Sequence, residues 1–303
     1  MGGRGTGRKI NIVTFAYAYT KEPPVKTEND KYVPIDDTVR AADNLIVRLA
    51  LAGNRYYSYF DDRSGQTELL NGWNAITDSF MFWAYDMDYT EYLWYMPFIG
   101  QISQNLEGFG KMNISYMLNQ GEYNSRNNWM STMKNYLYSR LYWNVNRNPY
   151  EILDEYLNLY YGVGGSYVKQ MIMLFEEHFA KLFAEDPDLT INVTMNRQYK
   201  DSKYYTAELL EKATDFITAA QQAVKEQIKD DEECEKYLVR LARVKVTPMR
   251  MTMRYYQYLY PMADQRETKA FYKEFFDTCD YGGVTFWSES SSISALRKSY
   301  NID

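Results

Sequence analysis

Three carboxylates stand shortly after apolar segments of the chain. Asp86 and Asp88 follow the segment Ser79–Tyr85, and Glu122 follows the segment Met112–Leu118. Because the chain has a single histidine, any acid/base chemistry falls mainly on Asp, Glu and Tyr. We therefore regard these three residues as candidate acid/base residues. Their alternative roles are structural, because Asp is common in turns and a Glu stabilises the N-terminus of a helix.

Aromatic and polar side chains occur in or just after the same kind of segment. Arg48 lies inside an apolar segment, where an unpaired charge is costly. It needs a carboxylate, either from the protein, which is the more usual solution, or from an acidic sugar. Aromatic rings at these positions either stack on a sugar or pack the core. The candidate substrate-binding residues are Tyr17, Tyr19, Arg48, Trp83, Tyr85, Asn119 and Gln120.

Residues for other kinds of chemistry are scarce. The chain has one histidine, His178, and two cysteines, Cys234 and Cys279, which are far apart and form no CxxC motif. A His-rich metal site is excluded and a Ser/His triad is disfavoured. We expect no metal site and no cofactor, and the sequence leaves open whether the two cysteines pair.

The first half of the chain alternates between short apolar segments and helical patterns. The segments are rich in Ile, Val, Phe and Tyr and are too short for helices, so they predict strands that are buried on both faces. The predicted strands are Lys9–Tyr17, Asn44–Ala50, Ser79–Tyr85 and Met112–Leu118, and the predicted helices between them are Glu68–Thr77 and Ile99–Phe109. The proline-containing stretch Lys21–Asp43 is predicted to be a long loop.

The second half of the chain reads as helical. A helix is expected to begin near Asn128, and further helices are expected from Pro149 onward. In both stretches apolar residues recur at spacings of three and four. A helix over Glu232–Tyr260 is expected to kink or split at Pro248, another is expected over Thr268–Thr278, and the segment Asp280–Ser288 is expected to be extended.

These elements predict an α/β fold, with about four parallel strands of a (β/α)8-type barrel followed by an all-helical domain. We place the half barrel at residues 1–145 and the helical domain at residues 146–303. A half barrel leaves two open sheet edges. The chain is then a fragment of a longer protein, self-associates through these edges, or forms an open sheet covered by its helical half.

The composition limits the class of partner. The formal net charge of −6 argues against nucleic acid, which needs a concentrated basic surface. No apolar run reaches the length of a membrane span. The first residues, MGGRGTGRK, do not have the apolar stretch of a signal peptide. The chain has 31 tyrosines, whose amphipathic rings suit both clefts and helix packing.

The chain resembles an uncharacterised bacterial family, a domain of unknown function common in glycan-degrading gut bacteria and related to α-glucuronidase-like glycoside hydrolases. The matching stretches, which run in the family's order, are VTFAYAYTKEPP, DNLIVRLA, FWAYDMDYTEYLWYMPF, NQGEY and LYSRLYWNVNRNPYEILDEYLNLYYG. The resemblance corresponds to the later part of a family member. It implies a sugar-directed barrel with its cleft at the C-terminal ends of the strands, and a secreted or cell-surface location. Many members carry Trp-Asp-Tyr in place of Trp83-Ala84-Tyr85, and an acidic residue in place of Asn119.

Three functional hypotheses follow. The first is a glycoside-hydrolase-like protein that acts on a complex glycan by carboxylate acid/base chemistry, although this chain alone is not assigned activity. The second is a glycan-binding protein that uses the same strand-end cleft without catalysis. The third is an assembly module whose tyrosine-rich helices pack against a partner.

Overall fold

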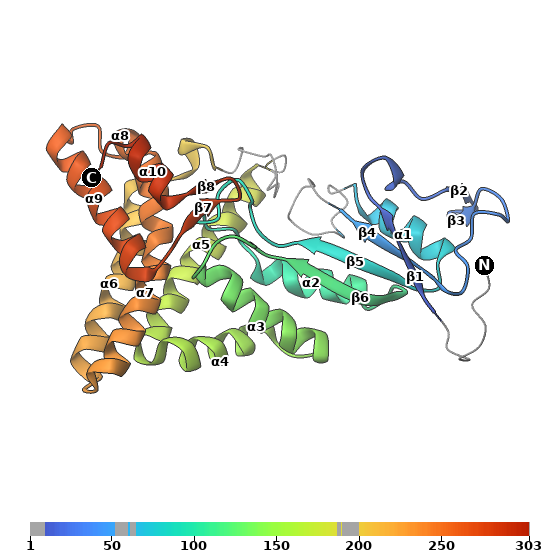
Figure 1. Ribbon diagram of the computed structural model, residues 1–303, viewed down its shortest axis with the longest axis horizontal. Helices are drawn as coiled ribbons and strands as arrows, with labels where there is room; N and C mark the ends of the chain where they lie inside the picture. Colours follow the sequence, from blue (N-terminus) through green and yellow to red (C-terminus); the bar gives the residue numbers. More distant parts are fainter. Residues whose placement is uncertain (1–9, 52–59, 61–64, 187–188, 190–199, 303) are drawn as a thin grey trace. The chain divides into compact units, whose positions relative to one another are not determined.

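The computed structural model describes residues 10–51, 60, 65–186, 189 and 200–302 (Figure 1). The chain forms two compact units. The sheet unit consists of Met1–Asp86 and Gln104–Gln120, and the helical unit consists of Met87–Ser103 and Gly121–Asp303. The division at residues 145 and 146 stays a prediction.

A four-stranded parallel sheet forms the centre of the sheet unit. Its strands are β1 (Ile12–Ala16), β4 (Leu45–Ala50), β5 (Phe80–Tyr85) and β6 (Ile114–Gln120), in the order β1-β4-β5-β6. In register, Phe15 pairs with Arg48, and Trp83 pairs with Leu118. The expectation of an α/β fold with four parallel strands followed by a helical region is confirmed.

One face of this sheet is covered by helix α1 (Thr67–Ile76) and by the sheet-unit part of helix α2 (Ile99–Phe109). Leu49 and Phe82 on this face are fully buried, together with Leu70 of α1. The rings of Phe82 and Phe109 lie 4.7 Å apart between centroids. The buried face is therefore a hydrophobic core of the usual kind for an α/β layer.

The opposite face of the sheet is not covered in this way. Strand β5 alternates between buried and half-buried residues, and four of the five residues of β1 are exposed. The prediction that the first strand is buried on both faces is therefore wrong. β1 lies at the edge of the sheet, where an apolar composition does not guarantee a covering layer.

The stretch predicted to be a loop contains a hairpin instead. β2 (Val25–Glu28) and β3 (Lys31–Pro34) pair in antiparallel fashion across Asn29 and Asp30. Both turn residues have positive φ, 49° and 61°, as a type I′ turn requires. Asn and Asp tolerate this conformation better than most residues. The Asn-Asp pair therefore indicated a tight turn, although the prolines of the stretch favoured a loop.

The helical unit contains most of the remaining elements. They are α3 (Trp129–Trp143), α4 (Pro149–Tyr161), α5 (Gly165–Glu185), α6 (Ala207–Gln227), α7 (Asp231–Arg254), α8 (Tyr256–Leu259), α9 (Gln265–Gly282), α10 (Ile293–Ser299) and the short hairpin of β7 (Phe286–Ser288) and β8 (Ser291–Ser292).

Two boundaries of the helical unit differ from expectation. Helix α7 continues through Pro248 and ends at Arg254, so a split at the proline is wrong. Helix α9 runs on to Gly282, so the extended segment is shorter than predicted and begins after this residue. Over the described ranges, the structure contains no helix with the length and hydropathy that crossing a membrane would need.

Candidate functional site

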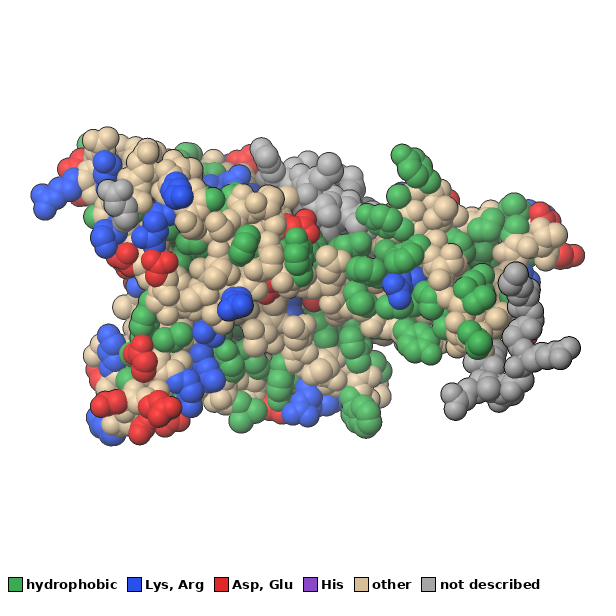
Figure 2. All heavy atoms as spheres, viewed as in Figure 1, with side chains coloured by type: hydrophobic (Ala, Val, Ile, Leu, Met, Phe, Trp, Pro, Cys, Tyr) green, Lys and Arg blue, Asp and Glu red, His purple; other side chains and the backbone are tan. Residues whose placement is uncertain are grey.

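The uncovered face of the sheet carries a row of aromatic rings. Phe15 on β1 and Trp83 on β5 have ring centroids 6.1 Å apart, and Trp83 stacks on Tyr85 at 6.2 Å with an interplanar angle of 19°. Phe15 is 51% exposed and Tyr116 on β6 is 53% exposed. Figure 2 shows hydrophobic side chains gathered over these strands. We call this surface, made by Phe15, Tyr17, Arg48, Trp83, Tyr85, Tyr116 and Gln120, the aromatic face.

Arg48 lies among these rings. Its guanidinium carbon is 4.9 Å from the centroid of Phe15 and 5.7 Å from that of Trp83, and its Nε donates to the sulfur of Met81 at 3.2 Å. An arginine favours such stacking because its guanidinium is planar and weakly hydrated. No carboxylate within the described parts of the chain forms an ion pair with Arg48, so the expected internal partner is not found there.

A polar contact fixes the ring of Trp83 at the C-terminal end of the sheet. The indole Nε1 of Trp83 donates to Oε1 of Gln120 at 2.9 Å. Burial raises the pKa of Tyr85 to about 12, and the neighbouring Tyr17 contributes in the same direction. Tyr85 is therefore protonated at neutral pH, and Trp83 is held in one orientation.

The structure brings together five of the seven predicted binding residues. Tyr17, Arg48, Trp83, Tyr85 and Gln120 belong to the aromatic face. Asn119 precedes Gln120 on β6 and pairs with Ala84, so strand alternation directs it to the opposite face.

Tyr19 lies apart from this group, in the 3-10 turn Ala18–Thr20, and is fully exposed. Sequence reasoning missed Phe15 and Tyr116. Phe15 has the same strand parity as Tyr17, which was the available signal.

The three candidate acid/base residues have a different environment. Asp86 is the last residue of the first segment of the sheet unit, and only 4% of it is exposed. Its backbone N–H donates to the carbonyl of Gln120 at 3.0 Å. Asp88 and Glu122 belong to the helical unit.

Asp88 is engaged in a buried ion pair. Its carboxylate lies 2.5 Å from Nζ of Lys200, and both side chains are at most 2% exposed. It also accepts hydrogen bonds from the backbone N–H and the hydroxyl of Thr90, at 2.9 and 2.6 Å. Such a carboxylate is held by its partners rather than presented to a ligand.

Glu122 lies near the start of helix α3. It accepts a hydrogen bond from the hydroxyl of Ser131, in the first turn of that helix. This position agrees with the structural alternative, in which a carboxylate stabilises a helix N-terminus.

Sequence reasoning did not identify the most deeply buried carboxylate of this region. Glu91 has a fully buried side chain and receives two hydrogen bonds from Arg250, from Nε at 3.1 Å and from Nη2 at 2.9 Å. Arg254 approaches the same carboxylate at 3.4 Å. Burial alone would lower the pKa of Arg250, but the Glu91 carboxylate outweighs it and the pKa is raised. The partners are 159 positions apart, so nothing in the local sequence indicates this pair.

The irregular segment Met87–Phe98 is buried almost throughout, so its backbone needs partners. The N–H of Tyr92 donates to the carbonyl of Trp287 at 2.7 Å, and the side chain of Asn128 donates to the carbonyl of Tyr92 at 3.0 Å. The N–H of Phe98 donates to Glu176 at 3.0 Å. Burial raises the pKa of the Glu176 carboxyl, although the hydrogen bond from Phe98 opposes this shift. The segment therefore serves as part of the core of the helical unit.

The metal-binding residue types and the two cysteines are the remaining candidates for a shared site. No group of three or more His, Cys, Asp or Glu side chains there has the arrangement of a metal site. Cys234 and Cys279 are free thiols, which answers the question that the sequence left open. Burial raises the pKa of the Cys279 thiol, so this cysteine is unreactive at neutral pH.

The comparison with protein families places the chain. Residues 8–173 match the model of a family described as Domain of unknown function (DUF4838), which covers more than half of the 303 residues. The chain belongs to this family. No curated protein and no solved structure matches it.

The DUF4838 match extends over all the candidate site residues, from Tyr17 to Glu122. It confirms the resemblance to a family of unknown function. The relation to α-glucuronidase-like hydrolases, the bacterial source and the glycan are not part of that match.

Proposed function

We propose that this DUF4838 chain binds a glycan on the aromatic face of its sheet unit, and that Arg48 receives the carboxylate of an acidic sugar. The observation that carries the proposal is the environment of Arg48. A guanidinium stacked between Phe15 and Trp83, with no carboxylate partner in the described part of the chain, offers two or more N–H donors to an incoming anion.

The rings around Arg48 suit the remainder of a sugar. Trp83 and Tyr85 are stacked side by side and half-buried, so they present a flat apolar surface next to the charge. The hydroxyl of Tyr85, which is protonated at neutral pH, is able to donate as well as accept. A uronic acid combines an apolar ring face, hydroxyls and a carboxylate, which are the three features that this surface complements.

Binding is better supported than hydrolysis. Glycoside hydrolysis usually requires two accessible carboxyl groups roughly 5–10 Å apart across the bond. Asp88 is buried against Lys200, Glu122 accepts from Ser131, and Asp86 is 4% exposed. We therefore assign these carboxylates structural roles, and we propose the glycan-binding hypothesis over the catalytic one. The partial barrel and the secreted or cell-surface location remain part of this proposal.

The test compares binding of an acidic oligosaccharide of uronic acids with binding of its carboxyl-reduced counterpart, measured by calorimetry on the full chain. Arg48→Gln should weaken binding of the acidic ligand by about 10- to 100-fold, because a hydrogen bond to a charged group contributes about 1.5–3 kcal/mol. It should leave binding of the reduced ligand almost unchanged.

Trp83→Ala should weaken the binding of both ligands, because in this proposal the ring stacks on the sugar whether or not the sugar is charged. Trp143→Ala is the matched control, because Trp143 is 92% exposed and belongs to the helical unit. If Arg48→Gln and Trp83→Ala bind both ligands as the unmodified chain does, the proposal is wrong.

A further inference from the structure

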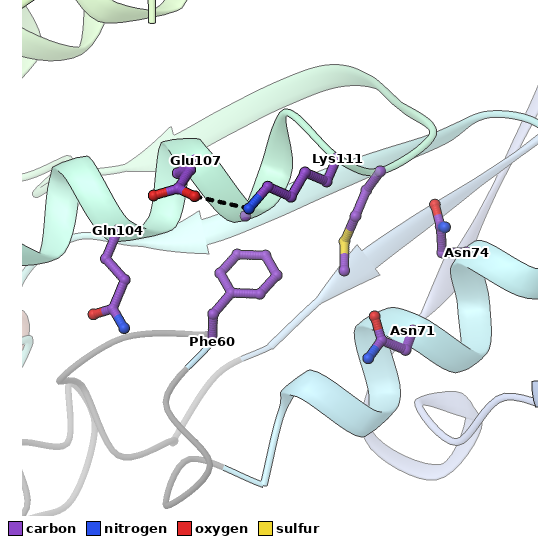
Figure 3. A pocket seen from close by; sticks show the side chains of 8 residues that line it. Phe60, Asn71, Asn74, Gln104, Glu107 and Lys111 are labelled. Carbon is purple, nitrogen blue, oxygen red and sulfur yellow. Dashed lines mark hydrogen bonds and ion pairs between the residues drawn. The ribbon is translucent and has the colours of Figure 1, made fainter. Parts of the chain in front are cut away.

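The sheet unit has a further candidate site on the face of the sheet that α1 and α2 cover. A cavity of about 380 Å³ lies between helices α1 and α2 (Figure 3). It is separate from the aromatic face, because α1 and α2 pack on the other face of the sheet. Its lining residues, all in the sheet unit, are Phe60, Asn71, Asn74, Gln104, Glu107, Gly108, Lys111 and Met112.

From this lining we infer that the cavity is a second binding site, for a single neutral sugar ring. The inference does not depend on the function of the aromatic face. It rests on three features of the cavity, which are an aromatic ring, two carboxamides that make no hydrogen bond to another described residue, and charges that already neutralise each other.

The aromatic ring is that of Phe60, which Figure 3 shows between the two helices. The ring lies directly over Gly108 of α2, where a Cβ atom would come within 2.3 Å of two ring carbons. It also packs edge-on against Phe109, with centroids 5.1 Å apart. The glycine at position 108 leaves room for this close approach, and the contact with Phe109 helps to place the ring beside the cavity.

The carboxamides come from both helices. Asn71 and Asn74 are one turn apart on α1, and Gln104 contributes from α2. Oδ1 of Asn74 is fixed because it accepts from the backbone N–H of Asn113 at 2.7 Å. Asn71 and Gln104 make no hydrogen bond to any other residue that the structure describes, so their amides are available as donors and acceptors for a ligand.

The charged residues of the cavity are paired with each other. Oε1 of Glu107 and Nζ of Lys111 are 2.7 Å apart, as the dashed line in Figure 3 marks. Glu107 lies in the last turn of α2, and Lys111 follows the end of this helix. This pair leaves the lining with no net charge. A charged ligand would gain little there, whereas hydroxyl groups can hydrogen-bond to both members of the pair and to the amides.

The lining residues, taken together, favour one class of ligand. An apolar surface from Phe60 and Met112 faces several uncharged polar groups across one small hollow. A pyranose presents an apolar C–H face and a rim of hydroxyls in the same way. The volume lies at the lower end of the range of about 300–1,000 Å³ for small-molecule sites, which suits one ring rather than an oligosaccharide.

The test observes the ε-methyl group of Met112 by NMR in the full chain carrying ¹³C-methyl methionine, with the signal assigned through Met112→Leu. Glucose, galactose and xylose serve as neutral probes, and glucuronate serves as the charged probe. We expect at least one neutral probe to shift the Met112 signal in a saturable manner below about 50 mM, and to do so more tightly than glucuronate.

Variants separate this site from the aromatic face. Asn71→Ala and Gln104→Ala should each weaken binding about fivefold, because a neutral hydrogen bond contributes about 1 kcal/mol. Asn146→Ala, an exposed carboxamide of the helical unit, and Trp83→Ala should leave the Met112 titration unchanged. The inference is wrong if none of the neutral probes shifts the Met112 signal, or if the shift persists undiminished in both Asn71→Ala and Gln104→Ala.

Discussion

Two arginines illustrate how differently the two units use the same side chain. Arg48 of the sheet unit stacks on Phe15 and Trp83 and has no carboxylate partner within the described residues. Arg250 of the helical unit is 3% exposed and forms a two-point hydrogen-bonded pair with Glu91. The first arrangement is the one on which the proposed binding of an anion depends, and the second uses the charge to neutralise a buried carboxylate.

The same contrast holds for the aromatic residues. Trp83 is half-buried on an open sheet face, whereas Trp94 is 1% exposed and donates its indole N–H to the hydroxyl of Tyr205 at 3.0 Å. Residue type alone therefore does not identify a site. Trp83 lies at a surface of the sheet unit, whereas Trp94 is part of the core of the helical unit.

The largest expected effect comes from replacing Arg250. Arg250→Met leaves the fully buried Glu91 without its main partner, and the free energy of unfolding should fall by about 3–5 kcal/mol. The same substitution at Arg48 should change stability by less than about 1 kcal/mol, because that arginine balances no buried charge. Urea unfolding followed by far-UV circular dichroism measures both.

A double variant sharpens this result. Glu91→Met together with Arg250→Met removes both charges of the pair, so it should recover much of the loss seen in Arg250→Met alone. If Arg250→Met and Arg48→Met prove equally mild, the two units do not use arginine differently.

The next effect distinguishes a structural Asp88 from a catalytic one. Asp88→Asn removes the charge that balances the buried Lys200, and stability should fall by about 2–4 kcal/mol. Glycan affinity should remain unchanged under conditions where the variant is folded. A variant of unaltered stability that has lost a glycan-dependent activity would instead assign Asp88 to catalysis.

A smaller effect is expected at the helix caps. Asn128 caps α3 by accepting from the N–H of Met130 at 2.9 Å, and its amide also donates to the buried carbonyl of Tyr92. Asn128→Ala should therefore cost about 1–2 kcal/mol. Asn148→Ala removes an exposed cap of α4 that makes no such second bond, and should cost less. Equal losses would mean that the bond to Tyr92 adds nothing to stability.

The smallest effect is a pH dependence from His178. Burial lowers the pKa of His178 below its ordinary value of 6.5, and its Nε2 is buried without a partner among the described residues. The unfolded chain then binds the proton more tightly, so this contribution to stability is complete above pH 6.5 and is lost as the pH falls through 6.5 toward the folded pKa.

The single histidine makes this prediction easy to check. Its ring resonance, titrated by NMR, should give a pKa below 6.5, and His178→Leu should remove part of the acid sensitivity of unfolding. A titration at or above 6.5 would show that the ring is not desolvated as described.

Local patterns in the sequence predict much of the sheet unit. The bounds of α2 at Ile99–Phe109 follow from apolar spacing and the Gly110 stop, and β5 is one residue shorter than predicted. Composition alone does not show which face of a strand is covered, and so β1 was expected to be buried. Parity along the strands would have grouped Phe15 with Tyr17, Trp83 with Tyr85, and Gln120 apart from Asn119.

Ion pairs between residues far apart in the sequence could not be predicted from local patterns. The pairs Asp88–Lys200 and Glu91–Arg250 join residues 112 and 159 positions apart, and only the folded chain brings them together. A carboxylate after a strand looks the same in sequence whether it faces a ligand or a buried cation. This is why position along the strands grouped most of the aromatic face in advance, while the environment of the carboxylates was not foreseen, and the binding role of these residues stays a prediction.

We propose that a ligand binds the aromatic face and not the buried interior of the helical unit. The indole N–H signals of the six tryptophans, followed by ¹⁵N NMR of the full chain during titration with a uronic-acid oligosaccharide, test it most directly. We expect a saturable shift of the Trp83 signal, with the signals of Trp94 and Trp129 unchanged. A shift confined to Trp94 and Trp129, or an unmoved Trp83 signal in the presence of measured binding, would contradict it.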